Sequence, residues 1–83
     1  MNKKKLLAKI KNNSENVRFN DFVTLINAFN FEIIRSKGSH FIYERKDVPE
    51  MLNIQNKKGK AKSYQVEQFL ELIEKYNLEL EDK

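Results

Sequence analysis

A chain of 83 residues, 40% of them hydrophobic, has room for one small domain with a single modest core. The lack of cysteine excludes disulfide bonds and thiolate metal sites, and a single histidine excludes a histidine-cluster metal site, so we expect neither a bound metal nor a cofactor. The net charge of +4 favours a polyanion as the binding partner.

Positive charge is concentrated in two segments of the chain. Residues 1–11 carry five lysines, residues 56–62 carry four, and neither segment has an acidic residue. Residues 63–83 carry six acidic residues against two lysines. Two basic segments separated by a near-neutral body favour a polyanion partner, while the alternative is that these lysines form ordinary solvated faces.

The N-terminal segment, residues 2–11, is predicted to be a short basic helix that docks on the rest of the chain, and the alternatives are a basic arm and a partly disordered segment. Its narrow apolar stripe consists of Leu6, Leu7 and Ile10. Lys9 and Lys11 interrupt the apolar run too early for a signal peptide, and no transmembrane stretch follows, so a cytoplasmic protein is expected. The chain is thus divided into a helix with its linker at 1–16 and a single domain at 17–83.

Residues 19–29 are predicted to form an amphipathic helix that faces the core. The apolar residues at helical spacing are Phe22, Leu25, Ile26 and Phe29. Asn20 is the predicted N-cap, and Asp21 suits the positive end of the helix dipole. Asn30 follows at the place where a left-handed C-cap is needed.

Residues 31–36 and 39–45 are predicted to pair as a β-hairpin, because β-prone residues lie on both sides of Gly38, which tolerates positive φ in a turn. A two-residue loop of Lys37 and Gly38 would place Arg35 opposite His40. In that register one face of the hairpin carries Phe31, Ile33, Arg35, His40 and Ile42. A lone histidine near a turn is usually an ordinary polar residue, so this pattern alone defines no site.

The second half of the chain is predicted to contain one more strand and one more helix. Residues 46–50 form a connection, because Pro49 cannot donate to a central ladder, and residues 51–55 alternate as a third strand. Ser63 is the predicted N-cap of the last helix. The apolar face of this helix consists of Val66, Phe69, Leu70, Ile73 and Tyr76. The acidic tail at 77–83 is expected to fray.

Residues 56–62 are predicted to form a basic loop that leads directly into the last helix. Its lysines are Lys57, Lys58, Lys60 and Lys62. Lysines at a helix N-terminus add to the positive end of the dipole, an arrangement that is unfavourable for stability but suited to phosphate. The alternative is a solvated turn before the helix.

The order of these elements predicts an α+β fold. A three-stranded antiparallel sheet needs cover on one face, and the two amphipathic helices can supply it. The N-terminal helix is then an addition to this sandwich, and the other face of the sheet is open.

The tripeptide Gly38-Ser39-His40 in this setting resembles the HicA (YcfA-like) family of mRNA interferase toxins. The resemblance covers residues 17–76 and includes the order helix, Gly-Ser-His hairpin, third strand, basic loop and closing helix. It implies a fold similar to the double-stranded RNA-binding domain (dsRBD) and an endoribonuclease that cleaves mRNA without the ribosome's help. It also implies the toxin of a type II toxin–antitoxin system, with a HicB-type antitoxin protein as partner.

The resemblance implies that His40 is catalytic, and histidine is the residue type that most often transfers protons near neutral pH. RNA cleavage also requires positive charge at the phosphate and a means of holding the strand. The candidate RNA-binding residues are Arg35, Lys37, Ser39, Lys57, Lys58, Lys60 and Lys62, with Gly38 forming the turn. Candidates for stacking on an unpaired base are Phe41, Tyr43 and Tyr64, although core packing is the favoured role for Phe41. Since the sequence has no cluster of metal ligands, we expect metal-independent cleavage that leaves a cyclic 2′,3′-phosphate.

Two other classes of function stay open at this point. A non-catalytic RNA-binding module of dsRBD-like fold would need the lysines but not His40. A small interaction protein would use its basic faces only for a protein partner. Salt-dependent RNA binding separates this last class from the others, and cleavage that depends on His40 separates the nuclease from the binding module.

Overall fold

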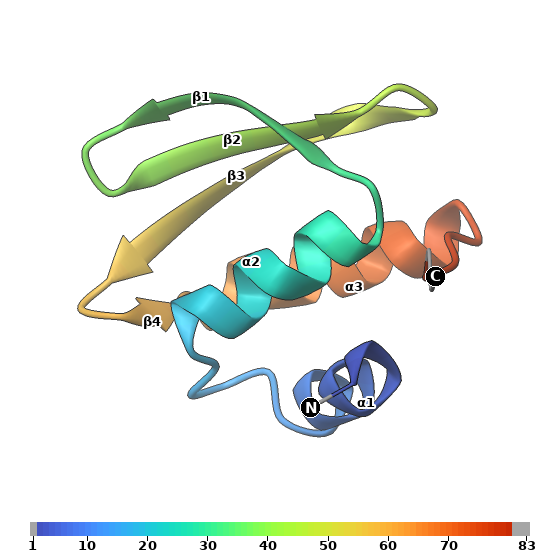
Figure 1. The fold of residues 1–83 in the computed structure, drawn as a ribbon, viewed down its shortest axis with the longest axis horizontal. Coiled ribbons are helices and arrows are strands. Elements are labelled where there is room, and N and C mark those ends of the chain that lie inside the picture. Colours follow the sequence, from blue (N-terminus) through green and yellow to red (C-terminus); the bar gives the residue numbers. More distant parts are fainter. Residues whose placement is uncertain (1, 81–83) are drawn as a thin grey trace.

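The computed structural model describes residues 2–80, which form three helices and one four-stranded antiparallel sheet in the order β1-β2-β3-β4. The elements are α1 (Lys3–Asn12), α2 (Phe19–Ala28), β1 (Glu32–Lys37), β2 (His40–Arg45), β3 (Val48–Lys57), β4 (Lys60–Ala61) and α3 (Ser63–Lys75). The sheet lies on one side of a layer formed by α2 and α3, and α1 lies on the other side of that layer (Figure 1). The predicted α+β class and N-terminal helix are confirmed, whereas the predicted three strands are corrected to four.

The core lies between the sheet and the layer of α2 and α3, with Phe69 of α3 at its centre. The rings of Phe22, Phe29 and Phe31 each meet the Phe69 ring edge-on, with 5.7 Å between centroids. Each of these four side chains is almost completely buried. Such edge-to-face pairs add about 0.5–1.5 kcal/mol beyond the burial of apolar surface. The aromatic cluster therefore joins both helices to the start of β1.

α1 is docked by the short apolar stripe expected from the sequence. Leu6 and Ile10 are buried, and Leu7 is partly buried against the same core. Burial of such a side chain contributes roughly 1.5–3 kcal/mol. Asn2 caps the helix, because its side-chain oxygen accepts the backbone N–H of Lys5 at 2.8 Å. No helix within residues 2–80 is long and apolar enough to cross a membrane.

The two ends of α2 are formed in different ways. Asn20, the predicted N-cap, lies inside the helix, and Arg18 precedes the helix without a side-chain cap. The N–H of Phe19 is satisfied instead by the carbonyl of Gly59, in the turn after β3, at 2.9 Å. At the other end Asn30 has φ of 65°, which confirms the predicted left-handed C-cap.

The β1–β2 hairpin has a different register from the predicted one. Its two-residue turn is Gly38-Ser39, so His40 lies opposite Lys37, and Arg35 lies opposite Ile42. Gly38 has φ of 60° at the first turn position, where a type II′ turn favours glycine. The prediction that Arg35 faces His40 is therefore wrong.

A β-bulge at Ile34 changes which residues share a face of the hairpin. The register shifts between Ile33 and Arg35, so Ile33 pairs with Tyr43 on the side of the helices, and Arg35 lies on the opposite side. Of the five residues predicted to share one face, those that do so are Arg35, His40 and Ile42. Phe31 lies in the core instead.

β3 is longer than predicted, and a fourth strand follows it. The predicted connection at 46–50 shrinks to a two-residue turn, so that Val48 pairs with Arg45. Pro49 lies within β3 without breaking the sheet. β4 pairs only with Asn56 and Lys57, so at Pro49 the edge of β3 that faces away from β2 has no neighbouring strand that would need a backbone N–H. The predicted basic loop is divided between the end of β3, a turn and β4.

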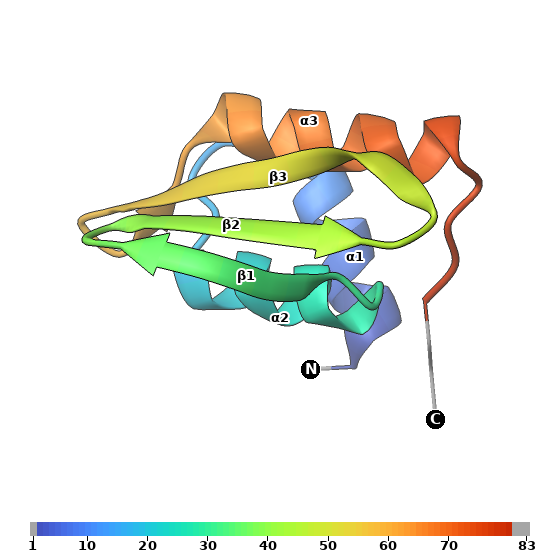
Figure 2. The same ribbon diagram turned by 90° about the horizontal axis from the view of Figure 1, so that it is seen from above.

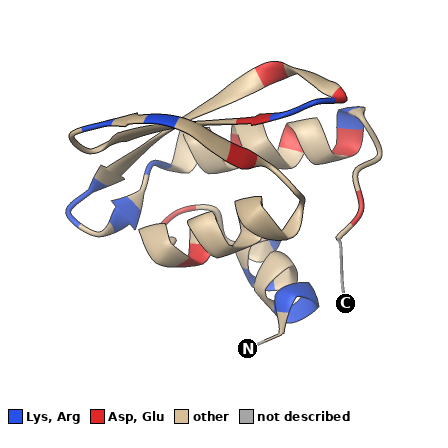
Figure 3. Cartoon of the chain, turned by 45° about the horizontal axis from the view of Figure 1, so that its top comes forward, with Lys and Arg blue, Asp and Glu red and all other residues tan. Residues whose placement is uncertain are grey.

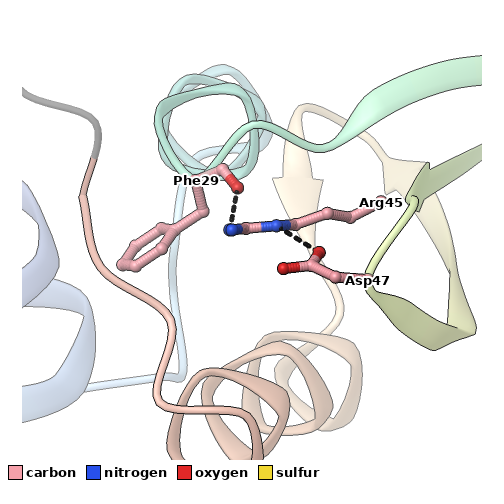
Figure 4. Close-up of polar contacts among 3 residues, drawn as sticks. All are labelled: Phe29, Arg45 and Asp47. Carbon is pink, nitrogen blue, oxygen red and sulfur yellow. Dashed lines mark hydrogen bonds and ion pairs between the residues drawn. The ribbon is translucent and has the colours of Figure 1, made fainter.

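Arg45 anchors the end of the sheet where β2 turns into β3. Its guanidinium donates to the carbonyl of Phe29 at 2.8 Å and to the carboxylate of Asp47 at 2.7 Å (Figure 4). The Phe29 carbonyl belongs to the residue that ends α2, where helix carbonyls lack partners within the helix. This contact joins the β2–β3 turn to the helical layer.

α3 buries three of the five residues predicted for its apolar face, Val66, Phe69 and Ile73, whereas Leu70 and Tyr76 are only partly buried. The buried residues of the helix are Gln65, Val66, Phe69, Leu72 and Ile73. Ser63 is the first residue of the helix rather than its N-cap, and Lys62 in the N-cap position provides no side-chain cap. Beyond the helix Leu78 is buried, in contrast to the expectation for a frayed tail, and tail residues 81–83 lie outside the described residues.

Candidate nucleic-acid interface

Two turns lie at the same end of the sheet, Gly38-Ser39 between β1 and β2, and Lys58-Gly59 between β3 and β4 (Figure 1 and Figure 2). Asn56 links them. Its backbone N–H donates to the carbonyl of Ser39 at 2.9 Å, and its side-chain oxygen accepts the N–H of Gly59 at 2.7 Å. The Gly-Ser-His hairpin and the lysine-rich segment, which are separate in the sequence, are thereby brought together.

His40 lies in a row of side chains across the open face of the sheet. Strand pairing places it between Lys37 of β1 and Gln55 of β3. Side chains directly opposite each other in such a sheet have Cβ atoms about 4.5–5.5 Å apart. The next residue, Phe41, points to the helices, where its ring packs 5.3 Å from that of Phe19. His40 therefore lies on the uncovered face, and it is exposed to solvent.

A second row on the same face consists of Arg35, Ile42 and Asn53. Arg35 and Lys37 are two residues apart on β1, so both cations lie on the face that carries His40. Lys57 follows Gln55 at the same spacing on β3 and pairs with Lys60 of β4, which places these two lysines on that face as well. The open face thus presents one histidine with cations on both sides.

The segments that build this end of the sheet carry only positive charge. Residues 35–43 and 51–66 contain six lysines and arginines and no acidic residue. We call this surface the basic end and define it by Arg35, Lys37, Lys57, Lys58, Lys60 and Lys62. The acidic residues of the hairpins, Glu32, Glu44, Asp47 and Glu50, lie toward the other end of the strands (Figure 3). Such a surface of one sign attracts a polyanion.

A shallow hollow of about 560 Å³ adjoins the basic end where β4 leads into α3. Its lining consists of Lys57, Lys58, Lys60, Ala61, Lys62, Ser63 and Tyr64. The Tyr64 ring is exposed, and the Lys62 ammonium lies 5.9 Å from the ring centroid. The hollow combines positive charge with one accessible aromatic surface, the pair of features that single-stranded nucleic acid binds.

Gln65 connects this hollow to the row that contains His40. Its side-chain oxygen accepts the backbone N–H of Gln55 at 2.8 Å, and its side-chain nitrogen lies 3.4 Å from the hydroxyl of Tyr64. Gln65 is only 5% exposed, so the contact is shielded from water. Sequence reasoning missed this residue, and the signal available was one glutamine directly before the apolar face of the last helix.

The structure brings most of the candidate residues together and corrects the role of others. Lys37, His40 and the lysines of the basic end share one end of the sheet, and Arg35 lies one row farther from the turn. Two of the three stacking candidates are turned toward the core: Tyr43 is buried, and Phe41 packs on Phe19. α1 lies on the side of the helical layer away from the sheet, so its lysines are not part of the open face (Figure 1).

Comparison of the chain with models of protein families, with curated proteins and with solved structures found no match.

Proposed function

We propose that this protein is an endoribonuclease of the mRNA interferase type, with His40 as its catalytic residue, that acts without the ribosome's help. The observation that carries the proposal is the row of Lys37, His40 and Gln55 on the open face, at an end of the sheet whose segments 35–43 and 51–66 carry six cations and no acidic residue. An exposed imidazole in a cationic surface suits a reaction at a phosphate, because it can accept a proton while nearby cations stabilise negative charge.

In the proposed reaction the imidazole of His40 accepts the proton of a ribose 2′-hydroxyl. The 2′-oxygen forms a bond to the adjacent phosphorus, and the bond from phosphorus to the 5′-oxygen breaks. Lys37, directly across from His40, stabilises the negative charge of the phosphoryl oxygens. The leaving 5′-oxygen takes its proton from a lysine, from water or from His40 in a second role. The products are a cyclic 2′,3′-phosphate and a 5′-hydroxyl, and this scheme requires no metal ion.

The proposal extends to the type of fold and to the toxin family. The order α2-β1-β2-β3-α3, with an antiparallel sheet on a pair of helices, is compatible with a dsRBD-like fold to which α1 and β4 are added. In that frame Gly38-Ser39-His40 occupies the hairpin that the HicA-type resemblance assigns to catalysis. The turn glycine at positive φ brings Lys37 and His40 opposite each other.

A nuclease of this kind acts on mRNA in the cytoplasm and needs a protein that restrains it. The proposed partner is a HicB-type antitoxin that covers the basic end. Because that end carries six cations, electrostatic complementarity favours an acidic surface on the antitoxin.

The experiment compares the wild-type protein with His40→Ala on a long single-stranded RNA without added metal. Lys46→Ala, in the turn between β2 and β3 at the opposite end of β2, is the control for an exposed substitution. Circular dichroism checks the fold of each protein. We expect the wild type and Lys46→Ala to cleave and His40→Ala to lose at least about a hundredfold in rate, the usual contribution of a general base.

Two results would contradict the nuclease proposal. Equal cleavage by wild type and His40→Ala would place the reaction elsewhere. Salt-dependent binding of RNA without cleavage by any of the proteins would instead identify a non-catalytic RNA-binding module, which needs the same lysines but not His40. A requirement for magnesium together with a 5′-phosphate product would overturn the cyclic-phosphate scheme.

A further inference from the structure

Tyr64 differs from the other two tyrosines of the chain in that its ring is open to solvent. Its residue surface is 59% exposed, whereas Tyr43 is buried in the core at 5%. Tyr76 donates its hydroxyl to the carboxylate of Glu50 and packs against the core. Of the large apolar side chains exposed within the described residues, only Tyr64 is aromatic, so its ring is accessible to a ligand.

The Tyr64 hydroxyl also lies close to a buried side chain. Gln65 Nε2 lies at hydrogen-bond distance, 3.4 Å, from the Tyr64 hydroxyl, and Gln65 Oε1 accepts the N–H of Gln55 at 2.8 Å. Gln55 is the cross-strand neighbour of His40. The ring is thus connected through one buried side chain to the strand beside the proposed catalytic residue.

The ring borders a shallow hollow that is lined mainly by lysines. The hollow beside Tyr64 measures about 560 Å³ and is lined by four lysines. Ligand pockets typically enclose about 300–1,000 Å³. A base lying on the ring would leave its flanking phosphates within the lysine-lined part of the hollow. Lys62, whose ammonium lies 5.9 Å from the ring centroid, contributes positive charge next to the base.

We propose that Tyr64 is a base-stacking platform of the RNA site and that it makes the site select unpaired RNA over duplex RNA. The proposal rests on the proposed function for the identity of the ligand as RNA. In an A-form duplex the faces of the bases are covered by their neighbours, so only an unpaired nucleotide can lay its base on a protein ring. Lysine contacts to phosphates do not make this distinction, because both forms of RNA present phosphates.

The test measures binding rather than cleavage, in the His40→Ala background so that the RNA stays intact. Fluorescence anisotropy compares a labelled single strand with a hairpin duplex of the same composition. Tyr64→Ala removes the ring, Tyr64→Phe retains it, and Met51→Ala is the control, since Met51 is equally exposed, at 60%, near the other end of β3. Because Tyr64 is exposed, these substitutions leave the core unchanged.

We expect Tyr64→Ala to weaken single-strand binding by roughly 5- to 150-fold, the range that corresponds to loss of one base–aromatic stack. Duplex binding should stay the same, and Tyr64→Phe and Met51→Ala should bind both RNAs as the parent does. A 2-aminopurine base in the single strand should be quenched by the parent and by Tyr64→Phe but not by Tyr64→Ala. Equal weakening of single-strand and duplex binding, or no weakening, would overturn the proposal.

Failure of this inference can be distinguished from failure of the proposed function. A wild-type protein that does not cleave RNA but prefers single strands through Tyr64 would refute the nuclease and support the stacking platform. A wild-type protein that cleaves RNA while Tyr64→Ala binds single strands normally would support the nuclease and refute the platform. No binding of either RNA at low salt would refute both.

Discussion

Lys37 and His40 face each other across the first two strands, and Arg35 lies one row farther from the turn. The interaction between two charges weakens with distance, and solvent ions screen exposed charges further. A phosphate held at His40 is therefore stabilised more by Lys37 than by Arg35. Both cations lie on the same strand and on the same face, so the difference between them can be measured.

We expect Lys37→Gln to lower the rate of RNA cleavage by about tenfold, which corresponds to about 1.4 kcal/mol of transition-state stabilisation. Arg35→Gln should lower it less. Single-turnover cleavage at saturating RNA measures this step, and each variant is the matched control for the other because both remove one positive charge. A larger loss in Arg35→Gln would mean that the cleaved phosphate lies in the row of Ile42 rather than in that of His40.

At the scale of elements, some features that depend on local conformation were predictable from the sequence, whereas those that depend on distant contacts were not. The left-handed cap at Asn30 and the apolar face of α3 follow from residue type and spacing alone. The start of α2 could not be predicted in this way, because the backbone N–H of Phe19 donates to the carbonyl of Gly59, which is far along the chain. The bulge at Ile34 has no signal in the sequence that we could identify, and it changes the face on which Ile33 lies.

The candidate site divides in the same way. His40 and the lysines were found from residue type, because few other side chains can transfer protons near neutral pH or bind phosphate as these do. The cation that faces His40 was predicted wrongly. A turn at Gly38-Ser39 lies one position along the chain from a turn at Lys37-Gly38, and this shift changes the cross-strand partner of every residue in the hairpin. The role of Gln65 was invisible for a different reason: its partner is a backbone N–H of β3, which is known only once β3 and α3 are packed together.

Glu50 provides an element-scale prediction for stability, because it ties β3 to the end of α3. Its carboxylate accepts hydrogen bonds from the ammonium of Lys75 at 2.8 Å and from the hydroxyl of Tyr76 at 2.5 Å. These hydrogen bonds hold the pKa of Glu50 below its usual value, and the bond from Lys75 has the larger effect. The same contact with Glu50 raises the pKa of Lys75 and the pKa of Tyr76. The contact therefore favours the charged carboxylate in the folded state.

A group whose pKa is lowered by folding contributes stability above its unfolded pKa, which for glutamate is about 4.3, and loses this contribution as the pH falls through the folded value. We expect Glu50→Gln to be less stable than the wild type at neutral pH, and this difference should shrink steadily below about pH 4. Urea unfolding at a series of pH values measures it. Glu74→Gln, an exposed substitution next to Lys75, is the control and should show no such trend. A difference that is constant with pH would mean that the contact does not depend on the carboxylate charge.

At the scale of the whole molecule, positive charge is concentrated in the basic end and in α1, and these two locations approach each other where Lys9 and Lys60 line the same hollow. The basic end lies at the tips of the strands, and the lysines of α1 lie beyond α2 and α3 (Figure 1 and Figure 3). Net charge alone would treat all of these lysines as equivalent. A specific RNA site at the basic end predicts that they are not, because only lysines that contact phosphates release counterions on binding.

Matched lysine substitutions test whether RNA binds only at the basic end or also contacts the lysines of α1. In the His40→Ala background, we expect Lys58→Gln to reduce the slope of log affinity against log salt by about 0.7 for single-stranded RNA, the value for one phosphate contact. Lys4→Gln removes the same charge from α1 and should leave the slope unchanged. Anisotropy titrations over a range of salt concentrations measure both slopes. If the two substitutions reduce the slope equally, the RNA also contacts α1, and a strand bound across the open face alone could not account for binding.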